Sequence, residues 1–140
     1  DTKLVLHRGD EWLFKNLPMQ GQLFGFQYDT PPNIDLFVEH EQTLEIGTTK
    51  IKVVHTPGHS PGGVCFHFKE GVLGETPVVF SGDTLFQSSV GRTDLWGADH
   101  KQMITSIKDR LMTLDEQTIV HPGHGPSTTV GIEKRSNPFL

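Results

Sequence analysis

Two segments of this chain share the pattern Pro-Gly-His-x-Pro, and each follows a run of apolar residues. The first segment presents His59 and the second presents His124. Because proline and glycine favour turns, each segment predicts a strand that ends in a rigid loop carrying one histidine. A third apolar run, Val78 to Phe80, ends at a Gly-Asp turn that presents the carboxylate of Asp83. A fold that joins these three strand ends gathers two imidazoles and one carboxylate.

Imidazole and carboxylate groups are natural ligands for zinc and other divalent ions, so the three residues predict one metal site. Taken alone, His59 is explained equally well as a turn residue that hydrogen-bonds to the backbone. The presence of Asp83 and His124 at equivalent strand ends favours ligation. Spacing by tens of residues is normal for ligands that the fold, and not the local sequence, brings together.

Charge and cysteine content exclude several classes of protein. The formal net charge is −5 and Lys and Arg form no cluster that would neutralise phosphates, so no nucleic-acid partner is expected. No apolar run approaches the roughly 18 residues that span a bilayer, so no membrane partner is expected. Cys65 is the one cysteine, which excludes an internal disulfide, and its alternating surroundings predict a buried structural thiol. The expected location is cytoplasmic.

At 140 residues, with no linker, the chain is expected to form a single domain over residues 1–140. It opens at Asp1 and passes directly into a strand-like run, so we expect that it is cut from a longer sequence. Residues 19–33 are interpreted as a long loop, 70–77 as a turn and 88–98 as irregular.

Apolar periodicity predicts the regular elements. Alternating or short apolar runs predict strands over residues 3–6, 36–38, 42–46, 50–54, 63–69, 78–80 and 118–120. Spacing of apolar residues at i, i+3 and i+4 predicts a helix over 99–114, with shorter helices over 9–15, ended by Asn16 to Pro18, and over 130–135. Strands that outnumber helices and are joined by hairpins predict an α/β fold with a mixed sheet and flanking helices.

The motifs carry a family resemblance. Thr56–Gly62, Ser81–Phe86 and Pro122–Gly125 resemble three of the metal-binding motifs of the metallo-β-lactamase fold superfamily, and the closest branch is its glyoxalase II-like hydrolases. Gly91–Asp94 and the closing Gly131–Leu140 resemble the short members of that branch, which lack the extra C-terminal helical domain. The resemblance implies an αββα sandwich, of which this chain is the C-terminal two-thirds.

The resemblance also implies a site and a reaction. His59 would complete a first metal position, His124 would complete a second, and Asp83 would bridge two zinc ions as the catalytic carboxylate, with iron or manganese as alternatives. The intact protein would hydrolyse a thioester such as an acyl-glutathione with a hydroxide held between the ions. The family motif His-x-His-x-Asp-His, which supplies most of the ligands, does not occur in these 140 residues. The chain by itself is therefore expected to be inactive and to self-associate.

Other residues have two or more explanations each. His55 is a partner that orients a metal ligand, or a core histidine bonded to the backbone. Arg92 and Asp94 pair with each other, brace the loop after Asp83, or contact an anionic substrate. His7 is expected on the surface. Four aromatic residues either anchor a loose loop to the core or wall a substrate cleft: Trp12, Phe24, Phe26 and Tyr28.

Two other functions remain open. The first is a mononuclear iron persulfide or sulfur dioxygenase on the same fold, because two histidines and one carboxylate also suit such a site. The second is a non-catalytic structural module. His124, as a good ligand for a second ion, favours the dinuclear hydrolase.

Overall fold

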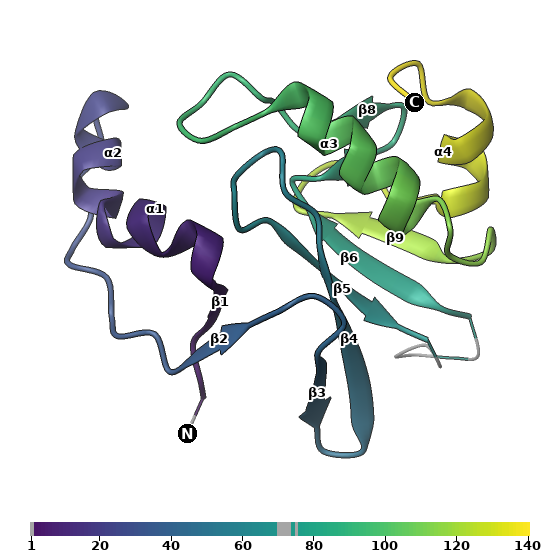
Figure 1. Cartoon of the computed structure of the whole chain (residues 1–140), viewed down its shortest axis with the longest axis horizontal. Helices are drawn as coiled ribbons and strands as arrows, with labels where there is room; N and C mark the ends of the chain where they lie inside the picture. Colours follow the sequence, from purple (N-terminus) through teal and green to yellow (C-terminus); the bar gives the residue numbers. More distant parts are fainter. Residues whose placement is uncertain (1, 70–73, 75) are drawn as a thin grey trace.

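The centre of the protein is a six-stranded mixed sheet (Figure 1). The computed structural model describes residues 2–69, 74 and 76–140. Neighbouring strands are antiparallel except for β6 and β9, which run parallel. In spatial order the strands are β10 (Thr128–Thr129), β9 (Ile119–Pro122), β6 (Val78–Gly82), β5 (Val64–Phe68), β4 (Thr49–His55) and β3 (Thr43–Ile46). The predicted α/β class with a mixed sheet is confirmed.

The predicted hairpin is the β3–β4 pair, in which Ile46 lies opposite Thr49. Gly47 has φ 60° at the turn, a conformation that glycine adopts without steric cost. Strand β4 then runs on to His55, and the chain turns into the loop that carries His59. The loop that carries His59 therefore lies at the end of strand β4.

One face of the sheet packs against α3 (His100–Ser106) and the π-helical turn η2 (Ile107–Leu111) that continues it. Asp99 caps α3 by accepting a hydrogen bond from the Gln102 N–H at 2.9 Å. Helix α4 (Val130–Ser136) ends the fold, and its Val130 joins the same core. The core residues of this face include Val54, Cys65, Val79, Met103, Ile107, Leu111 and Val120. Both helices predicted here are confirmed.

The other face of β5, β6 and β9 exposes aromatic rings. The Phe80 ring lies 5.5 Å from the Phe68 ring and 5.3 Å from the His121 ring, measured between centroids. Phe80 is 43% exposed, which is unusual for a large apolar residue in a central strand. The sheet is thus packed on one face and leaves apolar surface on the other.

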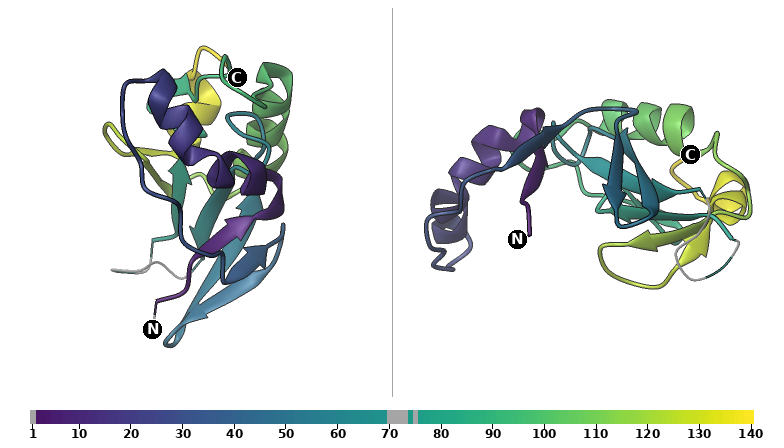
Figure 2. Two further views of the ribbon diagram at one scale, coloured as in Figure 1. Left: turned by 90° about the vertical axis from the view of Figure 1, so that its left-hand side faces the viewer. Right: turned by 90° about the horizontal axis from the view of Figure 1, so that it is seen from below.

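The N-terminal residues form a separate lobe at one side of the sheet (Figures 1 and 2). Strands β1 (Val5–His7) and β2 (Leu36–Val38) pair in parallel as a sheet of their own. Between them lie the 3-10 turn η1 (Arg8–Asp10) and helices α1 (Glu11–Lys15) and α2 (Leu17–Leu23). We call residues 5–38 the N-terminal lobe.

Three predictions differ from the structure or fall outside it. The loop expected over 19–33 is wrong for its first residues, because Pro18 does not stop a helix but lies in the first turn of α2, where a missing N–H costs nothing. The irregular segment 88–98 begins with β8 (Ser89–Val90), which pairs with β7 (Leu85–Phe86). Most of the turn expected over 70–77 lies outside the described residues. Among the described residues, no helix is long and apolar enough to cross a membrane.

Candidate metal centre

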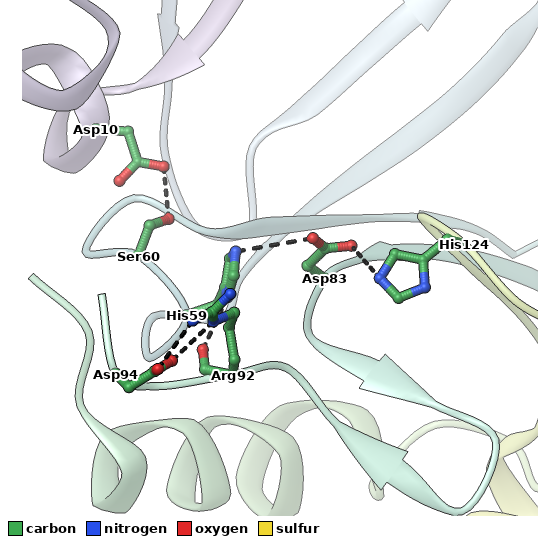
Figure 3. A network of polar contacts seen from close by, with 7 residues as sticks. All are labelled: Asp10, His59, Ser60, Asp83, Arg92, Asp94 and His124. Carbon is green, nitrogen blue, oxygen red and sulfur yellow. Dashed lines mark hydrogen bonds and ion pairs between the residues drawn. The ribbon is translucent and has the colours of Figure 1, made fainter. Parts of the chain in front are cut away.

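The structure brings His59, Asp83 and His124 together at the ends of β4, β6 and β9 (Figure 3). The Asp83 carboxylate lies between the two imidazoles. Its Oδ2 is 3.8 Å from His59 Nε2, and its Oδ1 is 3.8 Å from His124 Nε2. Each carboxylate oxygen therefore faces a different histidine.

A hydrogen bond fixes the tautomer of His59. The Nδ1 of His59 lies 2.8 Å from the carbonyl oxygen of Arg92, and this oxygen can only accept, so Nδ1 carries the proton. The lone pair of Nε2 is then directed at the Asp83 side. Histidines that bind metals are commonly oriented in this way, through a bond from the other ring nitrogen to a backbone carbonyl.

The His59 loop is held against α3. Ser106 donates a hydrogen bond to the Pro57 carbonyl at 2.7 Å, and the Asp99 N–H donates to the Gly58 carbonyl at 2.8 Å. Gly58 has φ 147°, and a Cβ there would lie 2.4 Å from the Cα of Met103. Only glycine allows the loop to approach the helix so closely.

Glycines also allow the Asp83 and His124 loops to touch. The Gly123 N–H donates to the Gly82 carbonyl at 2.8 Å. A Cβ on Gly123 would lie 2.6 Å from Asp83 Oδ1, and a Cβ on Gly91 would lie 1.8 Å from the Asp83 carbonyl oxygen. Gly123 thus keeps space for the Asp83 carboxylate, and Gly91 keeps space for the Asp83 backbone carbonyl. Beside them, the His124 ring lies 4.5 Å from the Phe86 ring.

A buried polar cluster joins the loop of His59 to the loop of Asp83. The hydroxyl oxygens of Thr56 and Thr84 are 3.2 Å apart, and the Thr56 hydroxyl is also 3.2 Å from the Cys65 sulfur. All three side chains are buried. Burial raises the pKa of the Cys65 thiol to about 11, so the predicted inert structural thiol is supported.

The N-terminal lobe is hydrogen-bonded to the His59 loop through Asp10. Its Oδ2 accepts a hydrogen bond from the Ser60 hydroxyl at 2.7 Å, and its Oδ1 accepts one from the Gly62 N–H at 2.6 Å. A Cβ on Gly62 would lie 2.5 Å from the Asp10 backbone nitrogen. The sequence alone did not indicate Asp10, because the contact spans 50 residues.

The structure distinguishes between the alternatives given above for His55, Arg92 and Asp94. His55 Nε2 lies 2.9 Å from the Pro61 carbonyl oxygen, which is the backbone-bonded alternative, and its ring stacks on His7 at 3.8 Å. His7 is therefore not a free surface residue as expected, and burial, followed by the nearby His55, lowers its pKa. Arg92 and Asp94 pair through two hydrogen bonds of 2.8 and 2.9 Å, which hold the pKa of Asp94 at about 2.

Comparison with known proteins decides the family. The family model described as the metallo-beta-lactamase superfamily matches residues 2–124. The chain belongs to the metallo-β-lactamase superfamily. Its fold is that of the solved members. The protein BLEG-1, solved as a B3 metallo-β-lactamase, superposes with a TM-score of 0.87 at 41% identity over 99% of this chain and 65% of its own. The protein TTHA1623, solved in a di-iron-bound form, superposes with a TM-score of 0.86 at 42% identity over 100% of this chain and 66% of its own.

Curated relatives within the metallo-β-lactamase superfamily include named hydrolases. The chain is 40% identical to hydroxyacylglutathione hydrolase GloC of Haemophilus influenzae, over 94% of this chain and 60% of that protein. It is 41% identical to the probable metallo-hydrolase YqgX of Bacillus subtilis, over 100% of this chain and 64% of that protein. The chain thus spans less than two-thirds of the length of these relatives.

The chemistry of the donor set, two imidazoles and one carboxylate, fits divalent metal ions. Two metal–ligand bonds of about 2.1 Å at a wide angle join a nitrogen and an oxygen that are nearly 4 Å apart, which is close to both observed separations. Each ion would receive one histidine and one carboxylate oxygen. In the described part of the chain, no three His, Cys, Asp or Glu side chains form a single complete cluster for an ion. The ligand role of the three residues stays a prediction, and each position needs further ligands.

Proposed function

We propose that the intact protein is a metal-dependent hydrolase of thioesters such as acyl-glutathione, with two divalent ions between His59, Asp83 and His124. The supporting relationship is the 40% identity with a hydroxyacylglutathione hydrolase across 94% of the chain. The supporting geometry is the Asp83 carboxylate, whose two oxygens face different histidines at 3.8 Å.

The reaction adds a water oxygen to the thioester carbonyl carbon, breaks the C–S bond and releases a carboxylic acid and a thiol. Bound divalent ions would supply Lewis acidity for the carbonyl and would lower the pKa of water. The residues of this chain would hold the ions in place and orient their ligands. Asp83 sets the separation between the two half-sites, and the Arg92 carbonyl keeps His59 in the tautomer that can bind a cation.

The pocket around these residues is large enough for a reacting group. It encloses about 380 Å³ and includes His59, Asp83 and His124, with Phe86 and Arg92 on its walls. Such a volume is within the range of small-molecule sites. The one observation that carries the dinuclear proposal is that His59 and His124 lie against different oxygens of the Asp83 carboxylate, which supports one ion beside each histidine.

The test compares the intact protein with the 140-residue chain. Metal content is measured by elemental analysis, and hydrolysis of S-lactoylglutathione is followed by release of the thiol. We expect two ions per intact molecule and thioester turnover, with no measurable turnover by the 140-residue chain alone. One iron per molecule together with oxygen consumption would replace the hydrolase with a dioxygenase, and an intact, metal-loaded protein without either activity would favour a structural module.

A further inference from the structure

A second pocket lies beside the metal centre and shares His59 with it. It encloses about 280 Å³ between α1, α2 and the segment that follows Arg92. The lining side chains are mainly apolar and include Leu13, Leu23, Phe24, Leu95 and Trp96. The two pockets therefore border the same predicted ligand, His59.

The walls of this pocket expose large apolar side chains. Leu23 is 65% exposed, Phe24 is 59% exposed and Trp96 is 43% exposed. Phe24 is therefore not anchored in the core but lines this pocket, and its role as the wall of a substrate cleft stays a prediction. Apolar side chains that gather around a concave surface mark a binding site more often than scattered exposed residues do.

Contacts within the lobe hold the pocket in a defined shape. Gln20 donates a hydrogen bond to the Leu13 carbonyl at 2.5 Å, which ties α2 to α1. The Trp12 and Trp96 rings meet edge to face with centroids 6.0 Å apart, which ties α1 to the opposite wall. Asp10 then fixes the lobe to the His59 loop. The position of the pocket relative to the His59 loop is therefore fixed by hydrogen bonds.

The second pocket offers no cation to an anionic thiol carrier among the residues that the structure describes. None of these lining side chains belongs to Lys or Arg, and the Asp94 carboxylate is paired with Arg92 through two hydrogen bonds of 2.8 and 2.9 Å. The metal pocket is lined by both Arg92 and Asp83. An uncharged apolar group needs no charged partner and covers the exposed apolar side chains of the second pocket.

We propose that the pocket between α1, α2 and Leu95–Trp96 binds the acyl group of the thioester, and that the enzyme prefers apolar acyl chains of several carbons to short hydroxyacyl groups. This inference rests on the proposed thioesterase function and specifies its substrate class. The carrier thiol lies on the opposite side of His59, toward Arg92 and Phe86.

The first measurement is binding of S-methyl-, S-butyl- and S-hexylglutathione, which are thioethers and cannot be hydrolysed. Each methylene that enters the pocket is expected to tighten binding by about fourfold, until the pocket is full. In a Trp12→Phe protein, the emission of Trp96 is expected to shift to shorter wavelength as the alkyl chain lengthens. The second measurement is kcat/KM for hexanoylglutathione against S-lactoylglutathione.

The test variant is Leu23→Ser, and the matched control is Ile46→Ser on β3, because Ile46 is 69% exposed and lies on the hairpin away from the pocket. We expect Leu23→Ser to reduce the gain per methylene to less than twofold, and Ile46→Ser to leave it unchanged.

Turnover that does not depend on chain length would overturn the acyl pocket while leaving the thioesterase intact. Binding that tightens with chain length in a protein without thioesterase activity would overturn the proposed function and retain the pocket. A change from dimer to monomer in Leu23→Ser, without a chain-length effect, would make this surface an interface between copies.

Discussion

The carboxylate of Asp10 accepts a hydrogen bond from the hydroxyl of Ser60 at 2.7 Å, although the two residues are 50 positions apart. Ser60 directly follows His59, so the N-terminal lobe contacts the metal centre one residue from a predicted ligand. The second oxygen of Asp10 accepts from the Gly62 N–H, and the loop is therefore held on both sides of Pro61.

Asp10→Asn is expected to weaken metal binding. The amide can accept one of the two hydrogen bonds but presents an N–H group to the other donor, which loosens the His59 loop. Loss of a contact that orients a ligand typically lowers metal affinity by about 10- to 100-fold. Titration with Co²⁺, followed by its visible absorption, reports both affinity and ligand geometry. Asp29→Asn removes the same charge from an exposed position and serves as the control; an equal effect in both variants would exclude the positioning role.

Asp83→Ala is expected to abolish most hydrolysis in the intact protein and to leave its fold in place. The side chain is 41% exposed, so its removal should change the free energy of unfolding by no more than about 0.5 kcal/mol. Metal content should fall, because both half-sites lose an oxygen ligand. Thermal unfolding without metal measures the first effect and elemental analysis the second. Near-normal turnover with full metal content would remove Asp83 from the mechanism.

The stability of the protein is expected to fall at alkaline pH because of Cys65. Its thiol has a pKa of about 11 in the fold, compared with an ordinary value of 9.0, since the buried thiol resists ionisation. The stabilising contribution is complete below pH 9.0 and is lost as the pH rises through about 11. The difference corresponds to about 3 kcal/mol.

Urea unfolding between pH 8 and 11 measures this loss, and the same series on Cys65→Ala separates it from the titration of other groups. The variant should show a smaller loss across this range. A native protein whose thiol reacts rapidly with a disulfide reagent at neutral pH would contradict the assignment, because a buried thiol of this kind is protonated and inaccessible.

Self-association of the 140-residue chain is expected to involve the aromatic face of β5 and β6. Phe80 is 43% exposed there and meets Phe68 edge to face, so pairing with a second copy would remove apolar surface from water. Phe80→Ser should lower the mass measured by light scattering at a given concentration, whereas Ile46→Ser should not. A monomeric wild-type chain at high concentration would contradict this expectation.

The parts of the fold that the sequence predicted are those with local signals. Proline and glycine mark the His59, Asp83 and His124 loops, and strand alternation places all three at strand ends, so their convergence followed from short segments. Helix α2 is not predicted from the sequence, because a proline such as Pro18 suits the end of one helix as well as the first turn of the next. The β7–β8 hairpin was missed because each of its strands has only two residues, too few to show a period.

Contacts across long separations carry no such signal. Nothing in the residues around Asp10 indicates that Ser60 lies beside it, and the stacking of His7 on His55 likewise depends on how the lobe meets the sheet. The exposure of Phe24 could not be deduced either, because an aromatic residue in a polar segment is compatible with both burial and a cleft wall.

The two-stranded sheet of β1 and β2 has a consequence for how such a protein can diversify. The α1–α2 side of the acyl pocket is carried by residues 8–24, between strands that pair with each other, whereas the metal loops belong to the six-stranded sheet. Mutations in residues 8–24 can therefore accumulate, or this stretch can be exchanged for that of a relative, while the loops of His59, Asp83 and His124 are inherited unchanged. Provided that Asp10 and its two hydrogen bonds are kept, the lining of the proposed acyl pocket can change without a change in the predicted metal ligands.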